Sequence, residues 1–254
     1  MRELNEIIDG TIKVLEDMKR TGVTHVEVSG KTIEDLGKPL VLAPKTSKAK
    51  PFSQVGTPIA SAGDPAIELV AIEARAKVCV KCAELSRCRT NVVFGTGNPR
   101  AEIMFVGEGP GHGEDLQGLP FVGRSGELLT KIIAAMGFAR EQVYIANVVK
   151  CRPPENRTPL PDEVANCLPY LLSQIELIQP KVLVALGATA IRALLDVQLG
   201  ITKIRGHWYT FRNIPIMPTF HPAYLLRNPP AKKEVWEDMK AVLEKLGREV
   251  PKSR

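Results

Sequence analysis

Four short apolar runs divide the chain after residue 75. They cover residues 102–106, 143–148, 181–186 and 214–219. Runs of this length without regular polar–apolar alternation are typical of strands that are buried on both faces. The pattern therefore predicts four central strands.

Helical spacing of apolar residues links and follows these runs, over about 124–137, 161–178, 188–196 and 231–246. The second of these segments begins with Pro161, Asp162 and Glu163, a combination typical of a first helical turn. Strands that alternate with helices form parallel sheets with right-handed crossovers. The sequence thus predicts an α/β fold, a three-layer α/β/α domain with a central four-stranded parallel sheet, over residues 70–248.

The first 70 residues have a different texture. Residues 3–20 repeat apolar side chains along one helical face, and residues 23–28 alternate as a short strand does. Prolines then recur in a stretch rich in Ser, Ala, Lys and Gly. We expect an N-terminal helical appendage at 1–39 and a flexible Pro/Ser/Lys-rich linker at 40–65.

Unusual residues follow the ends of the predicted strands. The sequence GEGPG occupies 107–111 after the first strand, Asn147 ends the second, Gly187 follows the third, and His221 follows the fourth. Ligands of open parallel sheets bind at the carboxyl ends of the strands. A ligand site at this edge is therefore expected.

Two nucleotide-binding motifs can be weighed against this site. Gly30-Lys31-Thr32 lacks the glycine that a phosphate-binding loop needs five residues before its Gly-Lys pair, because that position holds His25. The glycines at 107–111 suggest a dinucleotide-dependent oxidoreductase, but the fingerprint needs a glycine where His112 stands. Residues 114–123 are moreover expected to form a loop and not the required helix.

Charge is distributed unevenly. The chain of 254 residues has a net charge of +6, and residues 1–70 hold 9 basic and 10 acidic residues, so the positive excess lies after residue 70. A basic region suits a polyanion such as a nucleic acid. No apolar stretch is long enough for a membrane span, and the N-terminus has acidic residues where a signal peptide is basic. We expect a cytoplasmic, nucleoid-associated protein with no membrane partner.

Four of the five cysteines form a ligand-like pattern. Cys79 and Cys82 are a CxxC pair, and Cys151 and Cys167 lie much further along the chain. Four thiolates suit either zinc or a [4Fe–4S] cluster, and spacing alone separates these only weakly. Such a site would connect the segment before the first strand to the segment after the second, which indicates a structural role. Cys88 is the spare thiol.

Four motifs stand in order along residues 75–246: GEGPG, GLPFVGRSG, NVVKCRPPENR and HPAYLLRNP. Together with the cysteines they resemble the type-4 uracil-DNA glycosylases, the [4Fe–4S] branch of that superfamily. The resemblance implies a [4Fe–4S] cluster on the four cysteines named above, and a uracil pocket on a set of six residues. These are Gly107, Glu108, Gly109, Phe121, Asn147 and His221.

The chemistry of these residues agrees with that activity, since a base must be extruded from the duplex before its glycosidic bond is cut. Phe121 offers a stacking face, and the amide of Asn147 can accept from uracil N3–H and donate to O4, a pattern that cytosine reverses. His221 can donate to O2, where negative charge develops. Glu108 has three open roles: orienting a water, stabilising the cationic sugar, or excluding the thymine methyl group.

The position after Glu108 carries an aspartate in the best-known uracil glycosylases, where it positions the attacking water, whereas here it is Gly109. The catalytic residues are therefore expected to be Glu108, Asn147 and His221, with uracilate leaving first and water trapping the sugar cation.

Further residues are expected to contact DNA. Leu225, Leu226 and Arg227 form an apolar–basic tip that can wedge into the gap left by the base, although both leucines also suit the start of the terminal helix. Phosphate contacts are predicted for Lys150, Arg152 and Arg157.

The resemblance implies a DNA repair enzyme that acts on uracil in single- or double-stranded DNA. The alternative is a non-catalytic, or covalently uracil-trapping, DNA-binding relative on the same fold. We expect a monomer, in which residues 1–70 are available to a repair or replication partner.

Overall fold

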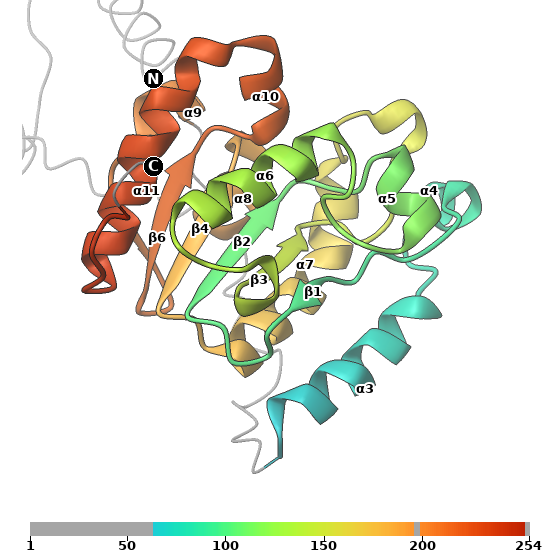
Figure 1. Ribbon diagram of the computed structural model, residues 1–254. Helices are drawn as coiled ribbons and strands as arrows, with labels where there is room; N and C mark the ends of the chain where they lie inside the picture. Colours follow the sequence, from blue (N-terminus) through green and yellow to red (C-terminus); the bar gives the residue numbers. More distant parts are fainter. Residues whose placement is uncertain (1–62, 196–198, 252–254) are drawn as a thin grey trace, which may run out of the picture. The chain divides into compact units, whose positions relative to one another are not determined.

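The computed structural model describes residues 63–195 and 199–251 (Figure 1). The expected appendage at 1–39 and nearly all of the expected linker at 40–65 lie outside the described residues. Described structure begins with α3 (Pro65–Lys77), whose first turn is capped by the side chain of Asp64. A capping carboxylate satisfies an N–H group that has no partner within the helix.

A mixed sheet forms the centre of the fold. The strands are β1 (Thr96–Gly97), β2 (Ile103–Gly107), β3 (Tyr144–Asn147), β4 (Val182–Leu186), β5 (Tyr209–Phe211) and β6 (Ile214–Thr219), in the order β1-β3-β2-β4-β6-β5. The four central strands are parallel, which confirms the prediction. The structure adds β1 and β5, two short antiparallel strands at the edges, which are too short to have left a pattern in the sequence.

The helices that follow α3 are α4 (Ala83–Cys88), α5 (His112–Gln117), α6 (Arg124–Ala135), α7 (Pro161–Ile178), α8 (Ala188–Leu195), α9 (Ile201–Ile204), α10 (Pro222–Arg227) and α11 (Lys232–Lys245). The four predicted helices lie where the apolar spacing places them, as α6, α7, α8 and α11, whereas that spacing does not predict α3. Single 3₁₀ turns are η1 (Arg140–Gln142), η2 (Pro154–Asn156) and η3 (Pro229–Ala231).

One of these helices corrects the sequence interpretation. Residues 114–117, expected in a loop, belong to α5, which ends in a left-handed Gly118. The helix is stabilised by tertiary contacts of Glu114 and Asp115, both buried, and these contacts are invisible to local spacing. A strand, a glycine-rich turn and a helix are thus present, and His112 in place of the third glycine remains the argument against a dinucleotide site.

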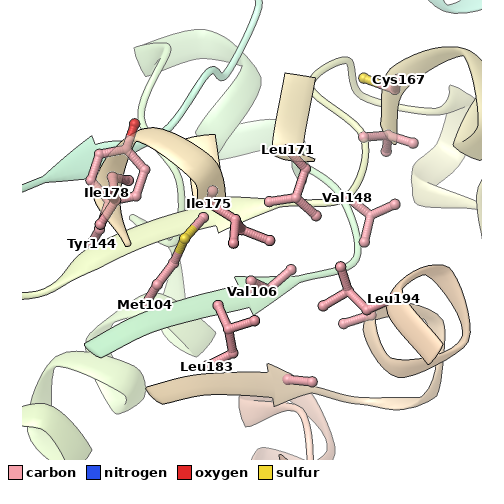
Figure 2. Close-up of a cluster of buried hydrophobic side chains, with 14 of the residues drawn as sticks. Met104, Val106, Tyr144, Val148, Cys167, Leu171, Ile175, Ile178, Leu183 and Leu194 are labelled. Carbon is pink, nitrogen blue, oxygen red and sulfur yellow. The ribbon is translucent and has the colours of Figure 1, made fainter. Parts of the chain in front are cut away.

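Two apolar layers enclose the sheet. On one face, Met104 and Val106 of β2 pack beneath Leu171 and Ile175 of α7 (Figure 2). On the other face, Ile103 and Phe105 of the same strand belong to a second cluster with residues of α6, α10 and α11. Alternate residues of β2 therefore enter opposite cores, and the three-layer α/β/α architecture is confirmed.

The parallel strands end at one edge of the sheet. Gly107 at the end of β2 is in register with Asn147 at the end of β3, and Leu186 of β4 is in register with Thr219 of β6. The loops that leave these strands therefore meet at this edge. Within the described part of the chain, none of the helices has the length and apolarity that crossing a membrane requires.

Candidate active site

A cavity of about 670 Å³ opens at the carboxyl edge of the sheet. Its walls include Glu108 and Gly109 after β2, Phe121 between α5 and α6, Asn147 at the end of β3, and His221 after β6. The structure thus brings the predicted pocket residues together, although they are separated by more than 100 positions in the sequence. Core packing alone does not require this convergence of polar groups.

Asn147 lies on the cavity wall and holds an unpaired acceptor. Its side chain is only 1% exposed. Among the described residues its Oδ1 atom has no hydrogen-bond donor. A buried polar atom without a partner costs roughly 1–3 kcal/mol, so such an atom in a cavity indicates a missing ligand group.

Gly107 makes room for that side chain. A Cβ atom at this position would overlap Asn147 Oδ1 and lie 2.6 Å from Cζ of Phe121. Any larger residue would displace both groups. Gly107 therefore belongs to the site through its small size, although its own atoms do not line the cavity.

Phe121 forms a wall beside His221, with ring centroids 5.5 Å apart and an interplanar angle of 32°. It has a φ of 53°, an unfavourable left-handed conformation for a bulky residue. Arg140 holds this loop by donating to the carbonyls of Pro120 at 2.7 Å and Phe121 at 3.0 Å. Burial lowers the pKa of the Arg140 guanidinium.

The other side of the Phe121 loop is fixed by Glu114 of α5. Its Oε1 atom accepts from the backbone N–H groups of Val122 and Gly123, each at 3.1 Å. The neighbouring Asp115 accepts from the backbone N–H groups of Thr90 and Asn91. The two carboxylates of α5 therefore hold two loops in place. The pattern of charges along the sequence does not identify these two residues.

His221 caps the first turn of α10. Its Nδ1 atom accepts from the backbone N–H of Ala223 at 3.1 Å, so the neutral ring carries its proton on Nε2. Burial, followed by the nearby Arg227, lowers the pKa of His221 to about 4. The side chain therefore enters the cavity at neutral pH as an uncharged hydrogen-bond donor.

Glu108 lies on the cavity wall with its carboxylate fixed. The Thr189 hydroxyl at the start of α8 donates to Oε2 of Glu108. At the next position, a Cβ atom on Gly109 would lie 2.7 Å from a methyl carbon of Val149. A side chain at 109 would thus require Val149 to move, which is a physical reason for glycine at this position.

The four predicted ligand cysteines lie close enough to influence one another's pKa. Burial raises the pKa of the Cys82, Cys151 and Cys167 thiols, that of Cys167 to about 12, and a smaller contribution in the same direction comes from neighbouring cysteines. Donors already face these sulfurs: Arg89 Nη1 lies 3.0 Å from Cys151, the Lys150 N–H lies 3.2 Å from Cys167, and Asn166 Nδ2 lies 3.8 Å from Cys82.

These donors suit thiolates that bind a metal, because hydrogen bonds to ligand sulfurs are the usual outer contacts of such sites. The Tyr170 hydroxyl donates to the Arg75 carbonyl at 3.4 Å, and burial, followed by the nearby Cys79, raises the pKa of Tyr170 to about 12. The donor set thus fits a four-thiolate group. Within residues 63–195 and 199–251, however, no group of three or more His, Cys, Asp or Glu side chains lies in an arrangement that could hold a metal ion. Cys88 is exposed at the end of α4.

The predicted DNA contacts are only partly at the surface. The phosphate contact predicted for Lys150 is wrong, because this side chain is 1% exposed and lies inside the domain. Burial lowers its pKa to about 7. Leu225 is also corrected, since it is fully buried in the second core; it lies in α10 and not in the terminal helix α11, so the terminal-helix alternative is wrong as well. Leu226 is 38% exposed, and Arg227 beside it is exposed and lines the cavity.

The two remaining arginines differ in their charge environment. Arg152 contacts Asn156 and Nδ1 of His112, neither of which is acidic. Arg157 is paired with both Glu163 and Glu84 at 2.7 Å, which compensates its charge. Arg152 and Arg227 are thus the better placed cations for a phosphate.

Comparisons with known proteins agree with this geometry. The uracil DNA glycosylase superfamily model matches residues 94–240. A type-4 uracil-DNA glycosylase from Thermotoga maritima is 54% identical over 161 residues, which is 62% of this chain and 82% of the relative. Relatives with the same description from Saccharolobus solfataricus and Archaeoglobus fulgidus are 46% and 44% identical, and the matches cover 71% and 68% of this chain and 86% and 90% of the relatives.

An α/β sheet with this pocket and this family match defines a member of the uracil-DNA glycosylase superfamily, and within it the chain belongs to the type-4 uracil-DNA glycosylases.

Proposed function

We propose that this chain hydrolyses the N-glycosidic bond of extruded uracil in DNA, releasing uracil and leaving an abasic site for base excision repair. The observation that carries the proposal is the buried, unpaired Oδ1 atom of Asn147 at the wall of the cavity. Uracil supplies the N3–H donor that this atom lacks. Cytosine presents an acceptor there, so it would leave the atom unpaired and add a repulsion.

The bound base would lie against Phe121. Stacking of a base on an aromatic ring contributes roughly 1–3 kcal/mol. The loop that holds this ring is fastened by Arg140 and Glu114, so the stacking face is preorganised. Binding then needs little rearrangement of the wall.

His221 would stabilise the leaving group. When the glycosidic bond breaks, negative charge develops on uracil O2, and a neutral imidazole that carries its proton on Nε2 can donate to that oxygen. The Ala223 N–H fixes the tautomer. Glu108, held by Thr189, would stabilise the cationic sugar by its charge, and water would then trap the sugar from the open side of the cavity.

We further propose that Cys79, Cys82, Cys151 and Cys167 hold a [4Fe–4S] cluster. The cluster would supply structural cross-linking of the segments before β1 and after β3. Hydrogen-bond donors to these sulfurs support this assignment. The uracil chemistry itself is assigned to the side chains of the cavity.

The proposal also covers the domain boundaries, the oligomeric state, the cellular location and the partners of the chain. The glycosylase domain would span 70–248, preceded by an appendage at 1–39 and a linker at 40–65. We propose a monomer that acts on DNA in the cytoplasm, in association with the nucleoid, with residues 1–70 available to a repair or replication partner.

The test starts from protein purified under anaerobic conditions, in which iron, sulfide and visible absorption are measured. The same sample is then incubated with oligonucleotides that contain a single uracil, or cytosine at the same position. We expect free uracil in amounts well above the enzyme concentration, and no release from the cytosine strand. Uracil DNA that becomes covalently attached without turnover would instead support the trapping relative.

A further inference from the structure

Lys150 carries a buried amino group that the proposed chemistry does not use. It lies between Asn147, which ends β3, and Cys151. Its side chain is 1% exposed and is one of the largest fully buried side chains of the described fold. Burial of a long charged side chain is costly unless its donors are satisfied, so its contacts are expected to matter.

Those contacts point back to the uracil site. Nζ of Lys150 donates to the backbone carbonyl of Asn147 at 2.8 Å and to Oε1 of Gln174 at 2.6 Å, and it lies 5.7 Å from the ring centre of Phe94. Within the described part of the chain, no carboxylate is hydrogen-bonded to it. Nζ is therefore held by oriented neutral dipoles and not by a salt bridge.

The Gln174 side chain is fixed in the orientation that faces Nζ of Lys150. Its Nε2 atom donates to the Phe94 carbonyl at 3.0 Å and to the Tyr144 hydroxyl at 3.1 Å. Because both amide protons are engaged, Oε1 must face Lys150. The position of Nζ is thus fixed from α7, on which Cys167 also lies.

The backbone of Lys150 is fixed as well. Its N–H donates to Sγ of Cys167 at 3.2 Å, and its carbonyl accepts from the Val93 N–H at 2.8 Å. Two residues earlier, the Val148 N–H donates to the Gly107 carbonyl at 2.9 Å. Hydrogen bonds therefore fix the backbone between Asn147 and Cys151. The Lys150 side chain adds a hydrogen bond within this segment, to the Asn147 carbonyl.

Resting on the proposed function, we propose that Lys150 is a positioning residue for uracil recognition. By binding the Asn147 carbonyl, it fixes the peptide plane from which the Asn147 side chain projects, and so aims the unpaired Oδ1 atom at the base. The hydrogen bond from its own N–H to Cys167 Sγ fixes the Lys150 backbone from which this contact is made.

The decisive variant is Lys150→Met, which keeps the length of the side chain and removes its donors. We expect the single-turnover rate of uracil excision to fall about 10- to 100-fold, because small displacements of a positioned group cost rates of this order. Affinity for free uracil, measured by calorimetry, should weaken in parallel. Affinity for uracil-free DNA, measured by fluorescence anisotropy, should not change.

Two matched variants interpret that result. Lys150→Arg restores donors at the same place and should recover part of the rate, which a purely space-filling role would not explain. Lys181→Met removes an exposed lysine that is paired with Glu102 at the opposite end of β4, and it should leave all three measurements unchanged. Iron content is measured in each variant, so that loss of the cysteine site is not mistaken for loss of positioning.

If Lys150→Met does not fold, Gln174→Met tests the same contact, since it removes the acceptor that holds Nζ. The expected result is again weaker binding of free uracil with unchanged affinity for uracil-free DNA. Wild-type uracil binding by Lys150→Met or, if that protein is not obtained, by Gln174→Met would overturn the inference. Absence of uracil excision by the wild-type protein would instead contradict the proposed function, so the two failures are distinguishable.

Discussion

The amide of Asn147 is the group on which base selection depends. Its oxygen is buried close to Gly107 and Phe121, and it has no partner among the described residues. The free protein therefore keeps an unsatisfied acceptor at the place where the base enters. Such strain at a ligand site is a common cost of preorganisation.

Replacing Asn147 by leucine tests this group directly. The variant keeps a similar volume and removes both the acceptor and the donor, so we expect kcat/KM for uracil excision to fall at least about 100-fold. Thermal stability should be equal or higher, because a buried unpaired oxygen has been removed. Asn213→Leu, in the exposed turn between β5 and β6, is the control, and an unchanged rate for Asn147→Leu would contradict the proposed recognition.

His221 makes stability depend on pH in a defined direction. Its folded-state pKa of about 4 lies below the ordinary value of 6.5, so between these values the unfolded chain binds more protons. This contribution to stability is complete above about pH 6.5 and is lost as the pH falls toward 4. We expect the melting temperature of the wild-type protein to fall more steeply over this range than that of His221→Gln. Parallel curves for the two proteins would show that His221 is not the responsible group.

At the scale of elements, the Phe121 loop depends on the closeness of α6. A Cβ atom on Gly126, in the first turns of α6, would collide with the Phe121 carbonyl and lie 2.8 Å from its Cα. Gly126→Ala should therefore displace the loop and destabilise the protein by roughly 1–3 kcal/mol, as overpacking usually does. Uracil excision should fall with it.

The matched control is Gly113→Ala within α5. Its nearest neighbour would be a Val122 methyl carbon at 4.0 Å, an ordinary contact, and alanine favours helix over glycine. We expect equal or slightly higher thermal stability in this variant, measured by calorimetry. Equal stability of Gly113→Ala and Gly126→Ala would show that the close approach to Phe121 is not limiting.

The proposed cluster on Cys79, Cys82, Cys151 and Cys167 would connect the segment before β1 to the segment after β3. Cys82→Ser removes one proposed ligand, whereas Cys88→Ser removes the exposed thiol of the same short helix region. We expect iron content and melting temperature to fall in Cys82→Ser alone, because metal binding contributes to folding free energy. Full iron content in Cys82→Ser would remove that residue from the ligand set.

Much of this element arrangement could be predicted from the sequence, since buried parallel strands and amphipathic helices have local patterns. The interiors of β2 and α7 are examples. What escaped prediction depends on distant contacts. The helix α5 is stabilised by the carboxylates of Glu114 and Asp115, Leu225 faces a core formed by other helices, and Lys150 meets its acceptor on α7. No local periodicity reports contacts across such separations.

For the whole molecule, the positive charge after residue 70 suits a DNA substrate, but individual cations differ in availability. Arg227 is exposed beside the cavity, whereas Arg212 is paired with Glu176 at the amino end of β6. Arg227→Gln should reduce by about one the slope of log affinity against log salt for DNA binding, because one phosphate contact is lost. Arg212→Gln should leave the slope unchanged. Equal slopes for the two variants would show that Arg227 does not contact a DNA phosphate.

The polarity of Asn147 also sets a limit on what the pocket can distinguish. Thymine carries the same N3–H and O4 groups as uracil, so hydrogen bonding at Asn147 accepts both. Since thymine is a normal constituent of DNA, an enzyme that selected bases by these hydrogen bonds alone would also excise thymine from undamaged DNA. Rejection of thymine must then come from steric exclusion of its 5-methyl group, so the shape of the pocket is as necessary for protecting undamaged DNA as the amide is for finding the lesion.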